Sequence, residues 1–269
     1  MARVPAMTEL LREELPRLGL RLEGYRNVRA TVEKRVRRRI AELGVGSLDA
    51  YRARLAADPE ERGRFESMCR IPISRFYRDG AVYDLLAREL LPARAAEAEA
   101  QGRAVRVWSA GCASGEEPYT VAIVWASIAR PSSVPLEIVA TDVEPSMLDR
   151  ARAATYEAGS LRELPAPLRT LGLHAQDGRW TVRAEHRACV TFERADLRGD
   201  APGGRFDLVL CRNNAFTYFA TDAQAAVLRR IVAALVPGGV LVVGAGETLP
   251  EAAPLIERAA SVLVRIPDR

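Results

Sequence analysis

The sequence is poor in the side chains that most often hold metals or form nucleophilic triads. Among its 269 residues are two histidines, His174 and His186, and a single lysine, Lys34. The four cysteines are scattered and form no C-x-x-C pair: Cys69, Cys112, Cys189 and Cys211. A zinc site and a Ser/His/Asp or Cys/His triad are therefore poorly supported, and we expect no bound metal.

Long apolar runs are missing as well. No stretch approaches the roughly 20 apolar residues that span a bilayer, and the N-terminus has no signal-peptide core. Hydrophobic residues make up 48% and charged residues 28%, which is typical of a soluble globular protein. We expect a cytoplasmic, reduced protein with no stable membrane insertion.

The first part of the chain has the apolar spacing of helices. We expect helices over residues 8–18, 28–43, 59–68 and 81–91, with one more that Ser47 caps. Residues 71–80 form a connector, and the Ala/Glu run after Pro92 is interpreted as a linker. The sequence thus predicts a helical domain with its connector over residues 1–91, and a second domain over 92–269.

From Val105 onward, predicted strands and helices alternate. A short strand is expected to begin at Val105, with others at 136–141, 206–211, 240–243 and 260–266, and helices at 145–154 and 221–235. Repeated β-α units favour a Rossmann-like α/β fold, with a mostly parallel sheet and helices on both faces. Residues 156–192 break this rhythm and predict a small β insertion, and Pro237–Gly239 predicts a turn.

The stretch Val105–Tyr119 reads V-R-V-W-S-A-G-C-A-S-G-E-E-P-Y. A strand, a small-residue loop and a helix let a backbone approach a nucleotide-like cofactor, although a tight turn without a ligand has the same pattern. The loop keeps only Gly111 and Gly115, and the carboxylates of Glu116 and Glu117 would repel a phosphate. It suits a cationic group, such as the amino group of S-adenosylmethionine.

Polar residues follow other predicted strands. Asp142 could accept both ribose hydroxyls or, alternatively, cap the next helix. Asp196-Leu197 could hold an adenine, through a hydrogen bond to its amino group and packing on its face. Asn213-Asn214 would lie beside the reacting centre. The aromatic pair Tyr218 and Phe219 would close the pocket, although such pairs also occur as ordinary core residues.

A basic cluster lies on the predicted helix 28–43. Between Lys34 and Arg39 it holds Arg35, Arg37 and Arg38. It could dock an acidic protein helix or nucleic acid, or be a solvated helix face. Aromatic residues are not interleaved with it, which counts against RNA stacking, and we expect no nucleic-acid partner.

These motifs resemble those of the CheR-type methyltransferases, the bacterial chemoreceptor glutamate O-methyltransferases of chemotaxis. The resemblance covers almost the whole chain. Its motifs are I-S-R-F-Y-R-D in the connector, then R-V-W-S-A-G-C-A-S-G-E-E-P-Y, A-T-D, V-x-F-x-x-x-D-L, F-D-L-V-L-C-R-N and L-V-P-G-G-V-L. The S-x-G-E-E-P-Y and C-R-N strings, in this order, are the most specific.

The resemblance implies a cofactor, S-adenosylmethionine, and its product S-adenosylhomocysteine. It implies cofactor contacts from Ser74, Arg78, Gly111, Glu116, Asp142, Asp196, Leu197, Asn213 and Asn214. Arg78 and Tyr218 would be the catalytic residues that flank the acceptor carboxylate. The implied partner is an acidic helix of a chemoreceptor's cytoplasmic region, docked partly through Lys34–Arg39, and we expect a monomer.

The chain departs from the family pattern on the acceptor side. The segment Cys211–Phe219 is one residue longer, the late G-H-S-E becomes Gly244–Glu247, and Pro72 replaces a polar residue. Asp196 also stands where Asn is common. Three hypotheses follow: a glutamate O-methyltransferase of chemoreceptors, the same chemistry on another protein or a small molecule, or a regulatory module that binds the cofactor without catalysis.

Overall fold

The structure is a computed structural model that describes residues 6–128, 133–199, 201–250 and 255–266. The chain forms two compact units. The first is Met1–Ile71 with Thr217–Gln224, and the second is Pro72–Phe216 with Ala225–Arg269. The boundary predicted after residue 91 differs from this division, which places the connector and the helices that follow it in the second unit.

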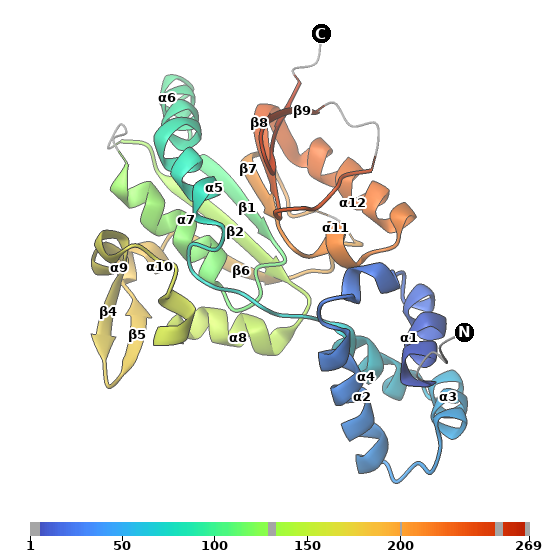
Figure 1. The fold of residues 1–269 in the computed structure, drawn as a ribbon. Helices are drawn as coiled ribbons and strands as arrows, with labels where there is room; N and C mark the ends of the chain where they lie inside the picture. Colours follow the sequence, from blue (N-terminus) through green and yellow to red (C-terminus); the bar gives the residue numbers. More distant parts are fainter. Residues whose placement is uncertain (1–5, 129–132, 200, 251–254, 267–269) are drawn as a thin grey trace. The chain divides into compact units, whose positions relative to one another are not determined.

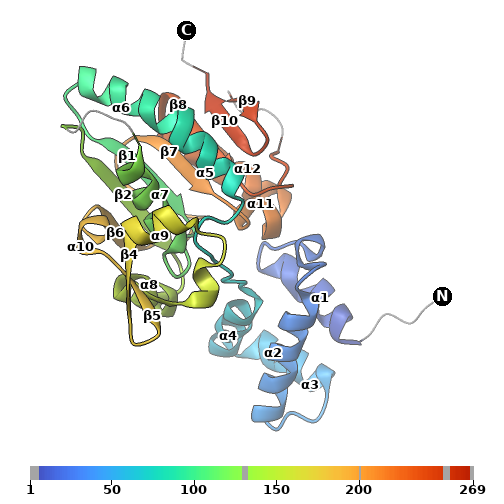
Figure 2. The ribbon, with the colours of Figure 1, turned by 60° about the vertical axis from the view of Figure 1, so that its left-hand side comes forward.

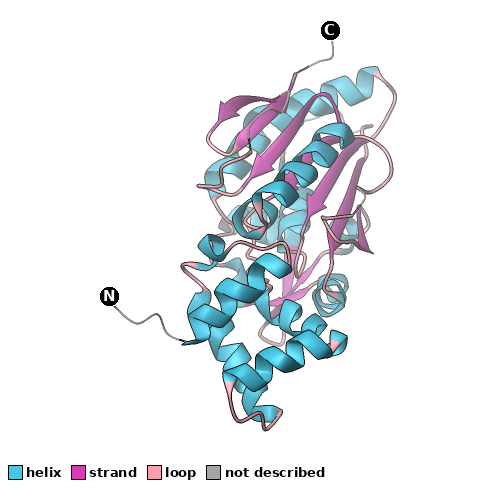
Figure 3. Ribbon diagram, turned by 90° about the vertical axis from the view of Figure 1, so that its right-hand side faces the viewer, coloured by secondary structure: helices cyan, strands magenta, loops and turns pink. Residues whose placement is uncertain are grey.

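The first unit is built from helices (Figure 3). They are α1 (Ala6–Arg17), the 3-10 turn η1 (Leu22–Tyr25), α2 (Arg29–Glu42), α3 (Leu48–Ala57) and α4 (Pro59–Cys69). Ser47 caps α3 as predicted, because its hydroxyl accepts the Ala50 N–H at 3.1 Å. Asp58 caps α4 in the same way. Buried Leu10, Val32 and Phe65 lie in a single apolar core of this unit.

A segment from late in the chain completes this first unit. It joins α11 (Ala215–Tyr218) to α12 (Thr221–Ala234). The Arg21 N–H donates to the Tyr218 carbonyl at 2.9 Å, and the Ala220 N–H donates to the Gly19 carbonyl at 2.8 Å. The rings of Tyr25 and Tyr218 lie 5.0 Å apart. Tyr218 is thus held by residues of the N-terminal helices, which sequence periodicity alone does not predict.

The predicted linker after Pro92 is instead helical. Helix α5 (Gly80–Leu85) continues through the π-helical turn η2 (Leu86–Leu90) into α6 (Leu91–Ala100). Proline has no N–H to donate and its ring clashes with the preceding turn, so a wider turn before Pro92 accommodates it. Ala95 and Ala98 are fully buried, which explains the small residues of this run.

The second unit contains a seven-stranded sheet with strand order β6-β2-β1-β7-β8-β10-β9 (Figure 1). Its strands are β1 (Val105–Ala110), β2 (Leu136–Asp142), β6 (Val190–Arg194), β7 (Phe206–Cys211), β8 (Leu235–Val243), β9 (Leu255–Ala259) and β10 (Val262–Arg265). The first five pair in parallel, whereas β10 is antiparallel to both β8 and β9. The fold class is therefore the predicted Rossmann-like α/β fold, although β9 was not predicted.

Both faces of the central strands are buried. Leu208 and Leu210 of β7 share a core with α7 (Glu116–Ser127), and the alternate residue Val209 is buried as well. Successive side chains of a strand point to opposite faces, so apolar groups cover the sheet on two sides. The predicted helix at 145–154 is α8 (Pro145–Ala153), and Gly239 lies in an irregular stretch of β8 where a turn was expected.

The insertion is a separate three-stranded antiparallel sheet, as predicted. It consists of β3 (Thr155–Glu157), β5 (Arg179–Val182) and β4 (Leu173–Gln176), in that order, with η3 (Ala158–Leu161), α9 (Ala166–Gly172) and α10 (Ala184–Arg187). Figures 1 and 2 show β4 and β5 beside α9 and α10, apart from the larger sheet. Its predicted end at residue 192 is wrong, because β6 pairs with β2 in the larger sheet.

Candidate functional site

The carboxyl ends of β1, β2, β6 and β7 bring most of the predicted site residues to one edge of the sheet. Strand β1 lies between β2 and β7, so the connections leaving these strands diverge beside it. Ligands of open α/β sheets bind in the crevice at such a point. The loop after β1, Asp142 at the end of β2, and Arg212 after β7 all belong to this edge.

The loop after β1 turns sharply at Gly111, whose φ is +85°. A Cβ atom at Gly111 would lie 2.0 Å from Nδ2 of Asn214, so a side chain is excluded there by both space and conformation. The structure thus brings two of the predicted cofactor residues together. It also explains why the residue at position 111 has no side chain.

Asp142 holds this loop in place. Its Oδ2 accepts the Ala113 N–H at 2.9 Å, and its Oδ1 accepts the Glu144 N–H at 2.9 Å. The alternative role as the cap of α8 does not hold, because the N-cap of that helix is Glu144. The Asp142 residue is half-buried.

Glu116 begins α7 and is 1% exposed. Its Oε2 accepts the hydroxyl of Ser114 at 2.8 Å and its Oε1 that of Ser160 at 3.3 Å. Among the described residues, no arginine or lysine forms an ion pair with it. A buried carboxylate with only neutral donors fits a cationic ligand group, because burying a charge without a partner is costly.

Glu117 differs from its neighbour. Its Oε1 accepts the Ser109 hydroxyl at 2.7 Å, and its Oε2 lies 3.5 Å from Nη1 of Arg212. Burial raises the pKa of Glu117, and this effect outweighs the opposing charges of Arg212 and Arg78. The start of α7 therefore carries two adjacent carboxylates with different surroundings.

The connector carries Ser74 and Arg78, both half-buried. Arg78 Nη1 donates to the Ile73 carbonyl at 3.2 Å. Its positive charge opposes the rise in the pKa of Glu117, although burial outweighs it. Tyr218 belongs to the helical unit and not to the unit that holds the connector.

Asp196 and Leu197 follow β6, as predicted. Leu197 is 9% exposed. The Asp196 carboxylate is bound by Arg198, whose Nη2 lies 2.6 Å from Oδ2 and whose N–H donates to Oδ1 at 2.9 Å. This pairing was not predicted, and it leaves Asp196 with a partner of opposite charge.

Asn213 has a left-handed backbone, with φ of +53°. Oε2 of Glu247 accepts its N–H at 2.9 Å and that of Gly244 at 2.6 Å. Glu247 therefore fixes the turn that carries Asn213. The departure from G-H-S-E keeps this acid, and its motif was a signal that could have identified it.

Ser160 and Arg212 were also not predicted as site residues. Arg212 stands in the C-R-N string, so its position was visible in the sequence. Ser160 lies in the insertion, where no pattern marked it. Its contact with Glu116 depends on the position of the 3-10 turn η3, 44 residues further along the chain.

The basic cluster on α2 divides into two groups. Arg35 donates to the carbonyls of Met68 and Arg70, and Arg39 forms a two-pronged ion pair with Glu61, so these two stabilise the helical unit. Lys34, Arg37 and Arg38 are exposed, although Arg37 also pairs with Glu33. Only part of the predicted docking surface is thus available to a partner.

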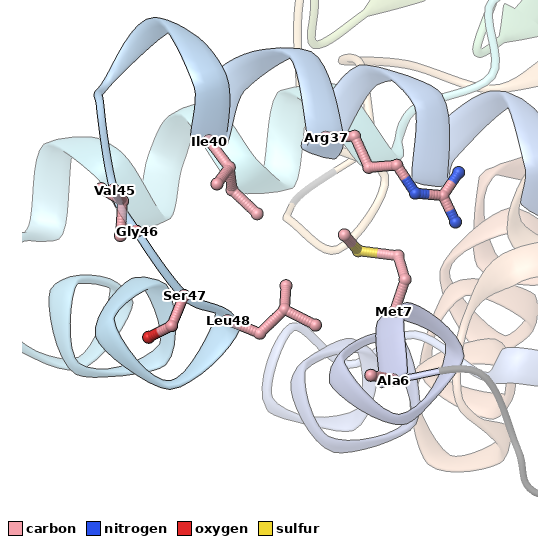
Figure 4. Close-up of a pocket in the computed structure, with 8 residues that line it drawn as sticks. All are labelled: Ala6, Met7, Arg37, Ile40, Val45, Gly46, Ser47 and Leu48. Carbon is pink, nitrogen blue, oxygen red and sulfur yellow. The ribbon is translucent and has the colours of Figure 1, made fainter.

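A pocket of about 430 Å³ lies in the helical unit (Figure 4). Met7, Ile40 and Leu48 point toward one another across it. None of the predicted site residues lines it, and the hydroxyl of Ser47 is used as a helix cap. Within the described ranges, no cluster of three or more His, Cys, Asp and Glu side chains could hold a metal, and no helix could cross a membrane.

Comparison with known proteins gives matches over most of the chain. Residues 73–262 match the model described as CheR methyltransferase, SAM binding domain, and residues 16–67 match CheR methyltransferase, all-alpha domain. A chemotaxis protein methyltransferase of Listeria innocua is 30% identical over 232 residues, which are 86% of each chain. Chemotaxis protein methyltransferase 2 of Pseudomonas aeruginosa is 32% identical over 84% of this chain and 80% of that protein.

A third relative is much longer than this chain. An uncharacterised 104.1 kDa protein of Rhodobacter capsulatus is 36% identical over 221 residues, which are 81% of this chain and 23% of that protein.

Proposed function

The chain belongs to the CheR methyltransferase family and is an S-adenosylmethionine-dependent methyltransferase, and from this premise we propose that it methylates glutamate side chains of a chemoreceptor. The carboxylate of Glu116 supports the donor half of this proposal most directly, because it is buried among hydroxyls and suits the donor's ammonium group. The names of the chemotaxis relatives support the acceptor half.

The proposed donor contacts follow from the edge of the sheet. Glu116 would bind the amino group, Asp142 the ribose hydroxyls, and Asp196-Leu197 the adenine edge. Gly111, Asn213 and Asn214 would line the cofactor near the methyl group, with Ser74 and Arg78 reaching it from the connector. The absence of a side chain at Gly111 lets the Asn214 amide lie against this loop, which supports placing both residues at the donor.

S-adenosylmethionine supplies a methyl group bound to a positively charged sulfur. A glutamate acceptor is already ionised at neutral pH, so the chain needs no general base to activate it. This accounts for a site without histidine. The protein contributes alignment, which can be worth about 7–11 kcal/mol, and exclusion of water.

We propose that Arg78 and Tyr218 act on the acceptor. A guanidinium and a phenol can orient a carboxylate through charge-assisted hydrogen bonds. The exposed residues Lys34, Arg37 and Arg38 offer positive charge to an acidic receptor helix, with the protein acting as a monomer.

Transfer of tritium from labelled S-adenosylmethionine tests this function. We expect base-labile label on a chemoreceptor cytoplasmic fragment, and its loss with Arg78→Ala while donor affinity stays moderate. Label that appears on a small carboxylic acid without any receptor would assign another acceptor. Tight donor binding without transfer to any carboxylate would make the protein a regulatory module.

A further inference from the structure

The connector backbone is unusual on both sides of Arg78. Tyr77 has a φ of +59° and Asp79 a φ of +60°. Side-chain-bearing residues rarely adopt this left-handed conformation, and they persist in it only where surrounding contacts enforce it. The contacts that do so here come from two other elements.

Arg212 holds the connector on the C-terminal side of Arg78. Its Nη2 donates to the Arg78 carbonyl and to Oδ2 of Asp79, both at 2.7 Å. Arg212 is 8% exposed, and its guanidinium lies 5.4 Å from the ring centre of Tyr83, whose hydroxyl accepts from Nη1 at 3.1 Å. A buried guanidinium in such a fixed fork leaves the connector little freedom.

Helix α7 holds the connector on the N-terminal side. The Tyr77 N–H donates to Oγ1 of Thr120 at 3.1 Å, and that hydroxyl donates to the Glu116 carbonyl at 2.6 Å. The backbone at Arg78 is therefore tied both to the helix that begins with Glu116 and to the end of β7. The Arg78 side chain makes a longer bond of 3.2 Å, to Ile73, so its direction depends on this backbone.

We propose that Arg212 and Asp79 form a positioning pair that fixes the backbone of Arg78 and so aims its guanidinium at the acceptor. The pair contacts Arg78 through its carbonyl, so its proposed effect on the acceptor is exerted through Arg78. This inference rests on the proposed function for its effect on catalysis, but the conformational effect can be measured without any acceptor.

The substitutions Asp79→Asn and Arg212→Lys distinguish the effect of losing the Arg212–Asp79 ion pair from the effect of straining the backbone. Asparagine tolerates the left-handed conformation, so Asp79→Asn removes the charge without adding strain. Lysine keeps the charge at position 212 but lacks the fork that reaches two acceptors. Asp149→Asn is the matched control, since Asp149 forms an exposed ion pair with Arg152 on α8.

Hydrogen exchange and methyl transfer are measured on the full chain. We expect exchange in the peptide covering residues 72–80 to quicken by about 10-fold or more in both variants, and not in Asp149→Asn. Methyl transfer to the receptor fragment should fall roughly 100-fold while the Kd of S-adenosylmethionine for Asp79→Asn stays within about threefold, as expected for misplacement of Arg78. The double variant should be no worse than the poorer single variant, because both remove one interaction.

Unchanged hydrogen exchange in the connector of both variants would overturn the proposal that Arg212 and Asp79 fix its backbone, whatever the acceptor proves to be. Faster exchange with unchanged transfer would overturn its role in positioning Arg78. A wild-type protein that transfers no methyl group would instead contradict the proposed function, and the exchange data would still decide whether the pair fixes the connector.

Discussion

Glu116 and Glu117 are neighbours at the start of α7, yet their carboxylates have different partners. Two serine hydroxyls bind Glu116, whereas Glu117 accepts one hydroxyl and forms an ion pair with Arg212. We propose that the first receives the ammonium group of the donor. Partial burial makes ionisation of the second costly and raises its pKa.

The stability of the protein should reveal the raised pKa of Glu117. Because burial raises its folded-state pKa above the unfolded value of about 4.3, its ionisation costs stability as pH rises through this interval. We expect Glu117→Gln to gain stability relative to wild type between acid and neutral pH. Denaturant unfolding at several pH values measures this, with the exposed Glu193→Gln on β6 as the matched control.

A relative stability of Glu117→Gln that falls as pH rises would contradict this assignment. It would show that the ion pair with Arg212 outweighs burial.

The loop between β1 and α7 is the element that sets the geometry of the cofactor site. Its backbone passes so close to Asn214 that Gly111 cannot carry a side chain. Asp142 fixes the same loop through the Ala113 N–H. The conformation of this loop thus depends on contacts with β2 and with the turn after β7.

Gly111→Ala should weaken cofactor binding and destabilise the protein by about 1–3 kcal/mol, because alanine at positive φ is strained and its Cβ would displace Asn214. Gly102→Ala is the matched control. Gly102 also has a positive φ, of +60°, but a Cβ there meets nothing within 4 Å. Calorimetric titration and thermal unfolding of both variants separate the clash from the strain, and equal cofactor affinities in the two would refute the crowding at Gly111.

An element could be predicted when its own residues carry the sequence pattern, and could not when its position depends on residues far away in the chain. Strands β1, β2 and β7 are apolar runs, so their positions were visible in the sequence. The helical run after Pro92 was interpreted as a linker, because proline and small residues are also common in linkers. Asp142 was singled out by its place at a strand end and Glu116 by its charge in the loop after β1, whereas the contact of Ser160 depends on the fold of the insertion.

The chain as a whole combines a helical unit with a methyltransferase unit, and a late segment of the chain belongs to the helical one. Sequence periodicity could not predict this, because the contacts of Tyr218 with Arg21 and Tyr25 join residues almost 200 positions apart. The two units are stabilised by separate networks, so their substitutions should have separable effects.

Glu61 stabilises the helical unit through Arg39 and the hydroxyl of Tyr51. Burial raises its pKa, but the hydrogen bonds from these two partners outweigh burial and lower it overall. We therefore expect Glu61→Gln to cost about 3–5 kcal/mol at neutral pH. The cost should shrink as pH falls through the lowered pKa, where the wild-type carboxylate becomes protonated.

Unfolding monitored from pH 7 down to pH 3 measures this cost, with Glu42→Gln as the control for an exposed partner of Arg39. A cost that stays constant with pH would disprove the ionic contribution. The affinity for S-adenosylmethionine should remain unchanged at neutral pH.

The assignment of Glu116 to the donor's ammonium group is tested most directly by calorimetry. The affinity of S-adenosylmethionine is measured for wild type, Glu116→Gln and the exposed control Glu157→Gln. We expect wild type and Glu157→Gln to bind alike. We expect Glu116→Gln to bind roughly 10- to 100-fold more weakly, since a hydrogen bond to a charged group is worth about 1.5–3 kcal/mol. Equal affinities for all three proteins would contradict the assignment of Glu116 to the donor's ammonium group.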